Sequence, residues 1–292
     1  MLRGIHVPLV TPFTSSGEVA ADAVEKLAGQ MLDEGAAGLV ALGTTAEVAA
    51  LDPAERALVV ETCVRVCAGR RAVLTVGVTG NDTRTTAAAL RELPAGVDAA
   101  LVTVPYFLRP GERGVIAHFE ALAEASPVPL VVYHIPYRTG QAVGAETLRR
   151  IGAHPNVAGV KYAAGGIDQD TIDLLADLPD KFEVLGGDDA FVSPLLALGA
   201  SGGILASAHL LTRSFVELVD AWQAGDVATA RPLGHRLAQV SRALFAEPNP
   251  TVIKGVLHAR GLIPTPDVRL PLLPASAAAV SQADLVAVHP GQ

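Results

Sequence analysis

Cysteine is scarce in this sequence, and the two that occur lie close together. Cys63 and Cys67 share one expected helix, and the other residues of the 292-residue chain include no cysteine. This excludes a disulfide framework and leaves a reducing cytoplasm as the simplest setting. Two thiols alone make a weak metal site, so we interpret both as side chains of the core or of a helix face.

Long apolar segments and runs of positive charge are also missing. Gly, Pro or charged residues interrupt each apolar run well before the roughly 18 residues that a membrane-spanning helix needs. The N-terminus lacks the apolar core and cleavage site of a secretion signal. The formal net charge is −8, and no cluster of Lys or Arg could follow a phosphate backbone. We therefore expect a cytoplasmic protein that binds neither membranes nor nucleic acids.

What the sequence does contain is a regular alternation of short apolar runs with longer amphipathic stretches. The runs are nearly continuous in apolar character, as parallel strands buried on both faces should be. They cover residues 5–10, 38–42, 73–78, 99–104, 130–133, 157–162, 182–185 and 203–206. Eight strand–helix repeats predict an α/β protein of the (β/α)8 TIM-barrel class. An open dinucleotide-binding sheet is disfavoured, because no glycine-rich fingerprint follows the first run.

The helical stretches carry their own start and stop patterns. Asp52 can cap the second helix, with Pro53 at its first position and Glu55 as the capping-box partner. We divide the chain into a barrel over residues 1–210 and a C-terminal helical extension, packed on the barrel, over residues 211–292. Within this extension, helices are expected over 214–224, 227–245 and 251–260, followed by a proline-rich tail.

Lys161 is the most informative single residue. Active sites of such barrels are built at the C-terminal ends of the strands, and Lys161 lies near the end of the sixth apolar run. The chain has four Lys, at 26, 161, 181 and 254, among 22 Lys plus Arg. A desolvated, neutral lysine amine can attack a ketone and form an imine, which Arg cannot do. The alternative is a structural Lys whose charge is met by a buried carboxylate.

Other strand ends supply polar groups that fit a small oxo acid. The Thr44-Thr45 turn could hold a carboxylate through its backbone N–H groups and hydroxyls, or could be a simple strand-to-helix turn. Tyr133 could relay protons or pack as a core aromatic. Arg138 offers a fork for a second carboxylate or is a solvated loop cation. Gly186-Gly187 could allow close backbone approach to a ligand, although a plain turn explains the pair equally well.

Metal and serine-nucleophile chemistry find little support. The sequence has no His/Asp/Glu cluster with metal-ligand spacing and no Gly-x-Ser-x-Gly motif. We therefore expect no metal and no separate cofactor, because the covalent imine itself would activate the 2-oxo acid.

Several motifs in order along almost the whole chain resemble the dihydrodipicolinate synthase / N-acetylneuraminate lyase family of pyruvate-dependent barrel enzymes. The motifs are Leu9-Val10-Thr11-Pro12-Phe13, Gly43-Thr44-Thr45-Ala46-Glu47, Val104-Pro105-Tyr106-Phe107, Tyr133-His134-Ile135-Pro136, Gly159-Val160-Lys161, Glu247-Pro248-Asn249-Pro250 and Leu270-Pro271. Arg138-Thr139-Gly140 looks like the synthase branch. The resemblance implies condensation of pyruvate with aspartate semialdehyde to 4-hydroxy-tetrahydrodipicolinate, in lysine and diaminopimelate synthesis.

The resemblance also implies a role for each site residue. Lys161 carries the imine, Thr44 and Tyr133 belong to a proton relay, Thr45 helps to bind the pyruvate carboxylate, and Arg138 grips the aldehyde substrate. Gly186 and Ile204 are expected to line the substrate pocket. The family implies a homotetramer of paired dimers.

Three positions depart from the family pattern. Phe107 stands where the relay has a second tyrosine, reaching in from a neighbouring subunit. Ala46 replaces the usual glycine, and Tyr162 stands where a synthase more often has Glu. Two alternatives therefore stay open: another pyruvate-dependent aldolase or dehydratase, acting on a keto sugar acid or secondary metabolite, and a barrel that binds a 2-oxo acid with little turnover.

Overall fold

The structure, a computed structural model, describes residues 2–288, and within them the strands close into one parallel barrel. Sequence neighbours pair with each other around the barrel, and β8 pairs back to β1. The strands are β1 Gly4–Pro8, β2 Gly38–Ala41, β3 Val73–Gly77, β4 Ala99–Thr103, β5 Leu130–His134, β6 Val157–Tyr162, β7 Glu183–Gly186 and β8 Gly202–Ile204. The predicted (β/α)8 barrel is confirmed, and each strand lies within two residues of the start of its apolar run.

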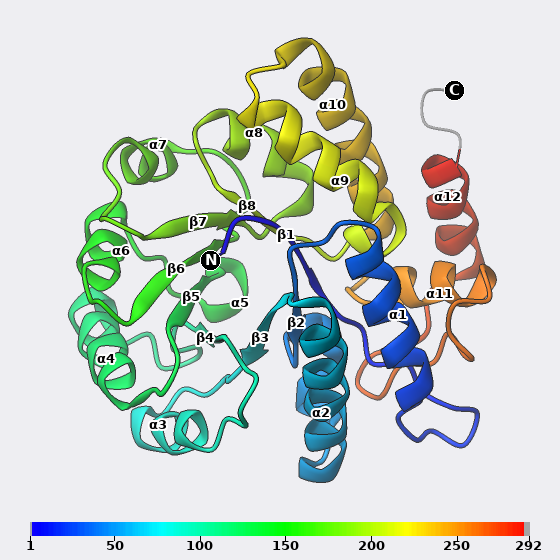
Figure 1. Cartoon of the computed structure of the whole chain (residues 1–292), viewed down its shortest axis with the longest axis horizontal. Coiled ribbons are helices and arrows are strands. Elements are labelled where there is room, and N and C mark those ends of the chain that lie inside the picture. The colour runs from blue at the N-terminus through cyan, green and yellow to red at the C-terminus, as the bar shows by residue number, and fades with distance from the viewer. Residues whose placement is uncertain (1, 289–292) are drawn as a thin grey trace.

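Helices surround this barrel on the outside (Figure 1). They are α1 Ala21–Asp33, α2 Pro53–Arg70, α3 Thr83–Arg91, α4 Gly111–Ala125, α6 Ala145–Gly152, α7 Gln169–Ala176, α8 Val192–Ala197 and α9 Ala208–Gln223. The short helix α5 Pro136–Thr139 lies instead at one end of the barrel. Three short 3-10 helices follow strand ends: η1 Thr44–Ala46, η2 Val48–Ala50 and η3 Asp189–Phe191. The expected start of α2 is confirmed, since the Asp52 side chain accepts from the Glu55 N–H and the Glu55 side chain accepts from the Asp52 N–H.

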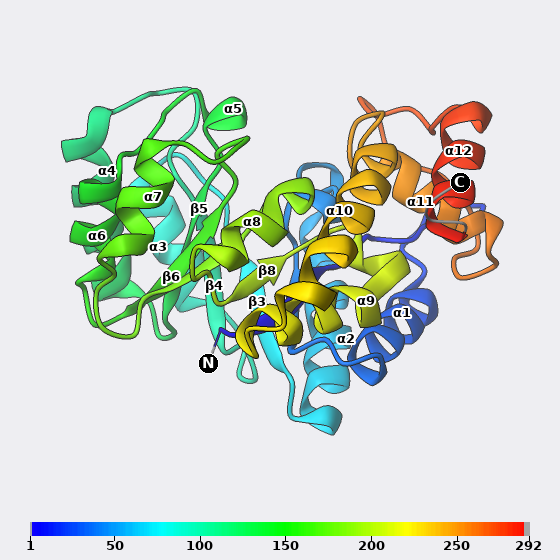
Figure 2. The same ribbon diagram turned by 90° about the horizontal axis from the view of Figure 1, so that it is seen from above.

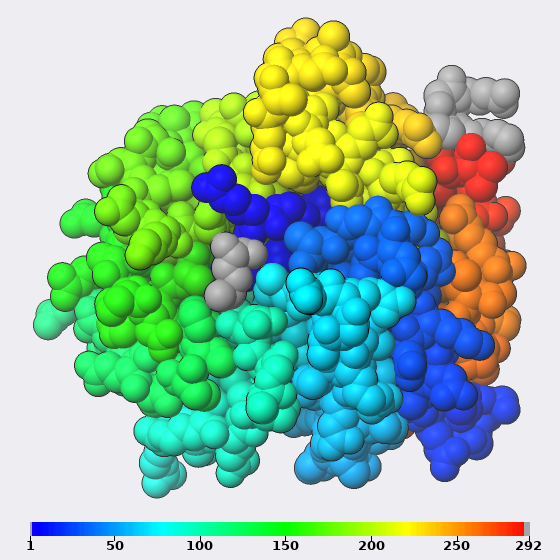
Figure 3. All heavy atoms as spheres, viewed as in Figure 1, coloured from blue at the N-terminus to red at the C-terminus, as the bar shows by residue number. Residues whose placement is uncertain are grey.

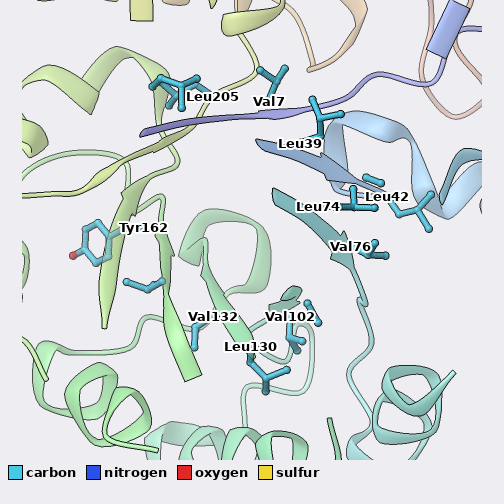
Figure 4. Packing of buried hydrophobic residues seen from close by; sticks show 14 of the residues in the cluster. Val7, Leu39, Leu42, Leu74, Val76, Val102, Leu130, Val132, Tyr162 and Leu205 are labelled. Atoms are coloured by element: carbon cyan, nitrogen blue, oxygen red, sulfur yellow. The ribbon is translucent and has the colours of Figure 1, made fainter. Parts of the chain in front are cut away.

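Side chains that alternate along the strands build two separate apolar regions. One set points outward and packs under the helices, as Val7, Leu39, Leu74 and Val132 show (Figure 4). A second cluster fills the barrel interior and includes Val40, Leu101, Val131, Leu185 and Ile204. Because both faces of each strand are buried, the strands read as continuous apolar runs in the sequence.

The chain ends in a group of helices that pack on the barrel beside α1 (Figure 2). After α9 come α10 Val227–Leu244, α11 Thr251–Ala259 and α12 Ala277–Val288. Their buried side chains form one cluster with Val10 and Leu27 from the start of the chain. Figure 3 shows the corresponding surface, with the orange C-terminal segment lying against the blue N-terminal one.

Two expectations about this C-terminal region need comment. The sequence predicted only a proline-rich tail after α11, but α12 follows there, with Ala283 fully buried. The helix was missed because its apolar residues continue around its circumference and give no clear amphipathic stripe. The division at residue 210 stays a prediction; α9 begins at Ala208, two residues before it.

Two further features concern the chain as a whole. Cys63 and Cys67 are both buried and free on α2, and burial raises the pKa of each thiol to about 12. None of the helices within residues 2–288 combines the length and the apolar character that crossing a membrane requires.

Candidate active site

A cavity of about 230 Å³ lies at the C-terminal ends of the strands. Pro8 and Ile204, the last residues of β1 and β8, line it together with residues on or directly after β2, β5, β6 and β7. Of the predicted site residues, it is lined by Thr44, Thr45, Tyr133, Arg138, Lys161 and Ile204. Gly186 and Phe107 lie outside this lining. The fold therefore brings together six residues from four separate parts of the sequence, around positions 44–45, 133–138, 161 and 204.

Lys161 reaches the cavity from β6, whose neighbours in the barrel are β5 and β7. It pairs in register with Tyr133 and Leu185, and its side chain is only 6% exposed. Among the described residues it has no ion-pair partner within 4.0 Å, and its Nζ lies 4.4 Å from the centre of the Tyr133 ring. Burial lowers its pKa to about 8, although Asp189 and Asp188 oppose this shift. A useful fraction of the amine is therefore neutral near neutral pH, as imine formation requires.

Tyr133 and Thr44 form a pair beside this amine. Burial raises the pKa of Tyr133 to about 12, and a hydrogen bond with the Thr44 side chain opposes part of the shift. The phenol therefore stays protonated and can donate to an oxygen in the cavity. Thr44 begins the 3-10 turn η1 directly after Gly43 and is half-buried, which leaves its hydroxyl between Tyr133 and the turn that follows β2.

Thr45 is held by Asn249, a residue for which no role was predicted. The Asn249 Nδ2 donates a hydrogen bond of 3.0 Å to the Thr45 Oγ1, and Asn249 also lines the cavity. Asn249 lies in the quoted motif Glu247-Pro248-Asn249-Pro250, so a pattern was present. What the sequence could not show is that the segment after α10 folds back over the turn after β2.

The Thr44-Thr45 turn rests on a buried network of charge. The Glu47 carboxylate accepts 2.8 Å hydrogen bonds from the Lys254 Nζ and from the Arg269 N–H. Lys254 also donates to the Thr11 carbonyl at 2.9 Å. The Thr11 hydroxyl in turn donates to the Ala46 carbonyl at 2.8 Å. Lys254 on α11 and Arg269 in the loop between α11 and α12 thus hold the predicted carboxylate-binding turn in place.

Arg138 stands exposed at the mouth of the cavity on the short helix α5. Its Nε donates to the neighbouring Tyr137 hydroxyl at 2.9 Å, and its guanidinium lies 5.1 Å from the centre of that ring. No carboxylate of the described chain lies within 4.0 Å of it. The guanidinium is therefore placed to receive an anionic group of a ligand.

The glycine that lines the cavity at the end of the seventh strand is Gly187, and not Gly186 as predicted. A Cβ on Gly186 would meet Val192 and Leu195 of α8, so this residue faces away from the cavity. Gly187 does line it, and a Cβ there would stand 2.9 Å from the Lys161 Cγ and 3.1 Å from its Cε. Close packing against the lysine stem is thus a requirement on residue 187. The two glycines are adjacent, and only the pleat of β7 separates their environments.

None of the three positions that depart from the family pattern lines the cavity, and Ala46 is buried in η1. Phe107 is 86% exposed, and its φ of 69° turns the loop after β4 outward. Tyr162 points to the outside of the barrel, where its hydroxyl hydrogen-bonds to the Thr171 Oγ1 at 3.2 Å (Figure 4). Since residues of a strand alternate in direction, Tyr162 faces opposite to Lys161. The role of Phe107 in a relay stays a prediction.

Asp188 and Asp189 are cavity residues that the sequence analysis did not single out for a role. Asp189 is 5% exposed, and its Oδ2 accepts a hydrogen bond of 2.5 Å from the Ser207 N–H. Burial raises its pKa to about 6, against the opposing effects of Ser207 and Lys161. Asp188 is half-buried and accepts from the Gly165 N–H at 2.7 Å. The sequence shows this acidic pair but not that it faces the lysine.

The barrel and this cavity define a class, that of (β/α)8 lyases which act through the amine of a buried lysine. Residues 1–287 match the model of the dihydrodipicolinate synthetase family, and the chain belongs to that family. A 4-hydroxy-tetrahydrodipicolinate synthase of Synechococcus elongatus is 39% identical over 272 residues, which cover 92% of this chain and 90% of that protein.

Solved structures agree with this relationship. A chloride-inhibited dihydrodipicolinate synthase from Acinetobacter baumannii, complexed with pyruvate, is 32% identical with a TM-score of 0.91, covering 99% of each chain. A monomeric dihydrodipicolinate synthase variant is 30% identical with a TM-score of 0.92, covering 98% of this chain and 95% of that chain.

Proposed function

We propose that this protein is a 4-hydroxy-tetrahydrodipicolinate synthase, which condenses pyruvate with aspartate semialdehyde for lysine and diaminopimelate synthesis. One observation carries the proposal: the Lys161 amine is buried in the cavity without an ion pair within 4.0 Å among residues 2–288, and its pKa is lowered to about 8. Such an amine can add to the pyruvate ketone. The names of the relatives at this level of identity support the choice of substrates.

The proposed roles follow the positions of the side chains. Lys161 adds to C2 of pyruvate, and Tyr133 donates the proton with which the former ketone oxygen leaves as water. Thr44 exchanges protons with Tyr133, and Thr45, held by Asn249, receives the pyruvate carboxylate. Arg138 binds the carboxylate of aspartate semialdehyde at the mouth of the cavity. General acid–base help of this kind typically contributes about 10²–10⁴-fold to a rate.

The test is turnover with both substrates present. The purified protein is incubated with pyruvate and aspartate semialdehyde, and formation of 4-hydroxy-tetrahydrodipicolinate is followed by mass spectrometry. We expect product to form with the unsubstituted protein and none with Lys161→Met. Consumption of pyruvate with other aldehydes, but not with aspartate semialdehyde, would contradict this choice of acceptor while leaving the imine intact.

A second candidate, a pyruvate aldolase with a different acceptor, is favoured by one specific observation. Arg242, from the last turn of α10, lines the cavity together with Arg138. Two guanidinium groups at one mouth would suit an acceptor with more than one acid group. A panel of mono- and dicarboxylic aldehydes, compared by kcat/KM, separates the two candidates.

We also propose that the reaction needs no separate cofactor, that the protein is cytoplasmic, and that it assembles as a homotetramer. The imine supplies the electron sink that a cofactor would otherwise provide. The tetramer rests on the family resemblance, and sedimentation analysis at assay concentration tests it. A monomer that turns over at full rate would contradict the tetramer.

A further inference from the structure

The proposed reaction places a positive charge in a buried cavity. When the Lys161 amine adds to the ketone, the carbinolamine takes up one proton and loses water, which leaves a C=N⁺ iminium. The iminium loses a C3 proton to become a neutral enamine, and it is cationic again after C3 bonds to the aldehyde carbon and the oxygen takes a proton. The amino group of the aldehyde substrate then adds to C2 and displaces the Lys161 amine with release of one proton, which closes the ring of the product. An isolated charge in such a site is costly, so the cationic states need a compensating group.

The groups that face Lys161 come from three parts of the barrel. Asp189 and Asp188 follow β7, Tyr133 lies on β5, and Tyr137 and Arg138 lie on α5. Arg138 and Arg242, which also lines the cavity, are cations, and burial keeps the Tyr133 phenol neutral by raising its pKa to about 12. Only the two carboxylates can therefore compensate a positive charge. Both line the same cavity as the lysine.

The two carboxylates differ in where they are held. Asp189 is buried, and the Ser207 N–H binds its Oδ2 at 2.5 Å, which fixes the carboxylate in the cavity wall. Asp188 is half-buried and is bound by the Gly165 N–H, in the loop that follows β6. Neither carboxylate has a Lys, Arg or His partner within 4.0 Å in the described part of the chain. A buried carboxylate without an ion pair of its own is available to a charge that appears only during the reaction.

We infer that Asp189 is the fixed counter-ion of the iminium that forms at Lys161. The inference rests on the proposed imine chemistry and adds a residue to it. The carboxylate stands apart from the free amine, so the amine is not locked into a salt bridge. It still acts on the iminium nitrogen across the cavity, because charges at a buried site interact more strongly than in solvent. The charge of Asp189 raises the pKa of Lys161, as expected when a negative charge stabilises a nearby cation.

This role has a consequence for pH. A fixed negative charge raises the pH at which the iminium loses its nitrogen-bound proton. Without the charge, the imine should lose this proton at a pH lower by about one unit or more, and one unit is a tenfold change in the equilibrium. A residue that only braces the loop before α9 would change stability and leave this pH unchanged.

The experiment compares Asp189→Asn with Asp188→Asn as a matched loss of charge. Each protein is incubated with pyruvate and sodium cyanoborohydride, which reduces the protonated imine, and the adduct is measured by intact mass across a pH series against a small-amine reference. The yield of adduct falls at alkaline pH, where the imine loses its proton. We expect this fall to occur at a pH lower by at least about one unit in Asp189→Asn, and to shift by less in Asp188→Asn. An unchanged profile in Asp189→Asn, or an equal shift in both variants, would overturn the counter-ion. If the unsubstituted protein gives no adduct at any pH, the imine itself is wrong.

A second measurement needs no change at residue 189, in case Asp189→Asn fails to fold. Carboxyl ¹³C NMR of aspartate-labelled protein follows the titration of Asp189 before and after cyanoborohydride has fixed a charged secondary amine at Lys161. We expect the pKa of Asp189 to fall with the adduct and to rise in Lys161→Met, because the cation lowers it. If the pKa of Asp189 stays the same in both the adduct and Lys161→Met, the inference is overturned.

Discussion

Lys161 and Lys254 are both buried lysines beside an aromatic ring, but they differ in the polar groups that contact the amine. Lys254 is fully buried, with Glu47 at 2.8 Å and the Thr11 carbonyl at 2.9 Å, and its Nζ lies 4.1 Å from the centre of the Phe13 ring. Lys161 has an aromatic ring at a similar distance but, within residues 2–288, neither an ion pair nor a hydrogen bond to its Nζ. Burial lowers the pKa of both amines, but only at Lys254 does a contacting carboxylate oppose it.

The difference shows that burial alone does not make a lysine reactive. The Glu47–Lys254 pair compensates both charges and uses them to hold the turn that carries Thr44 and Thr45. At Lys161 the charge of the ammonium is left without such compensation, so the neutral amine is favoured and can act as a nucleophile. The structural interpretation that the sequence left open for Lys161 describes Lys254 instead.

The largest expected effect is on activity. Lys161→Met should lower turnover with pyruvate by on the order of 10⁴-fold or more, since the atom that forms the covalent bond is gone. Lys254→Met, assayed at a temperature at which it is folded, should retain most of its capacity to form the imine. Steady-state rates measured side by side test this, and equal losses in both variants would erase the distinction between the lysines.

The second effect is on stability. Lys254→Met leaves the Glu47 charge buried and unpaired, which should lower the free energy of unfolding by about 3–5 kcal/mol. Adding Glu47→Gln removes that charge while keeping an acceptor for the Arg269 N–H, so the double variant should regain part of the loss. Urea denaturation measures both. If Lys254→Met is as stable as the unsubstituted protein, the Glu47–Lys254 pair does not hold the turn.

The sequence allows some features of the fold and the site to be predicted and leaves others undetermined. The strands could be predicted because each is buried on both faces and reads as one apolar run. Lys161 stood out because a chain that otherwise uses Arg has a Lys in such a run. Asp189 and Asn249 could not be assigned roles, because these depend on loops from distant parts of the chain that meet only in the folded barrel. Gly186 was chosen over Gly187 because a sequence does not show which way each residue of a strand end faces.

A third prediction concerns the acceptor side of the cavity. Arg138→Ala should weaken use of aspartate semialdehyde by about 1.5–3 kcal/mol in kcat/KM, the cost of losing a hydrogen bond to a charged group. Imine formation with pyruvate alone should remain nearly unchanged, because Arg138 lies at the mouth. An unchanged kcat/KM would mean that Arg138 does not bind the acceptor.

The smallest effect sharpens the comparison through pH. The pKa of Lys161 is lowered from 10.5 to about 8, so between these values the folded protein binds fewer protons than the unfolded chain. Stability therefore rises over this interval, and the cost of burying Lys161 is fully present below about pH 8. Lys161→Met should then raise the free energy of unfolding by about 1–3 kcal/mol at pH 7, the opposite sign to Lys254→Met.

Urea denaturation at pH 7 and at about pH 10 measures this gain, with Lys26→Met on the exposed face of α1 as the control. The gain should shrink at the higher pH, where the lysine is increasingly neutral in both states. Destabilisation at pH 7 would mean that the Lys161 charge is compensated in the folded protein.

The most direct measurement is covalent trapping followed by peptide mapping. The protein is treated with pyruvate and sodium borohydride, digested, and searched by mass spectrometry for a reduced pyruvyl adduct on each of the four lysines. We expect the adduct on Lys161, with the fully buried Lys254 unlabelled, and no adduct at this site in Lys161→Arg. Labelling of Lys254 in place of Lys161, or no labelling of either, would contradict the assignment of Lys161 as the imine-forming residue.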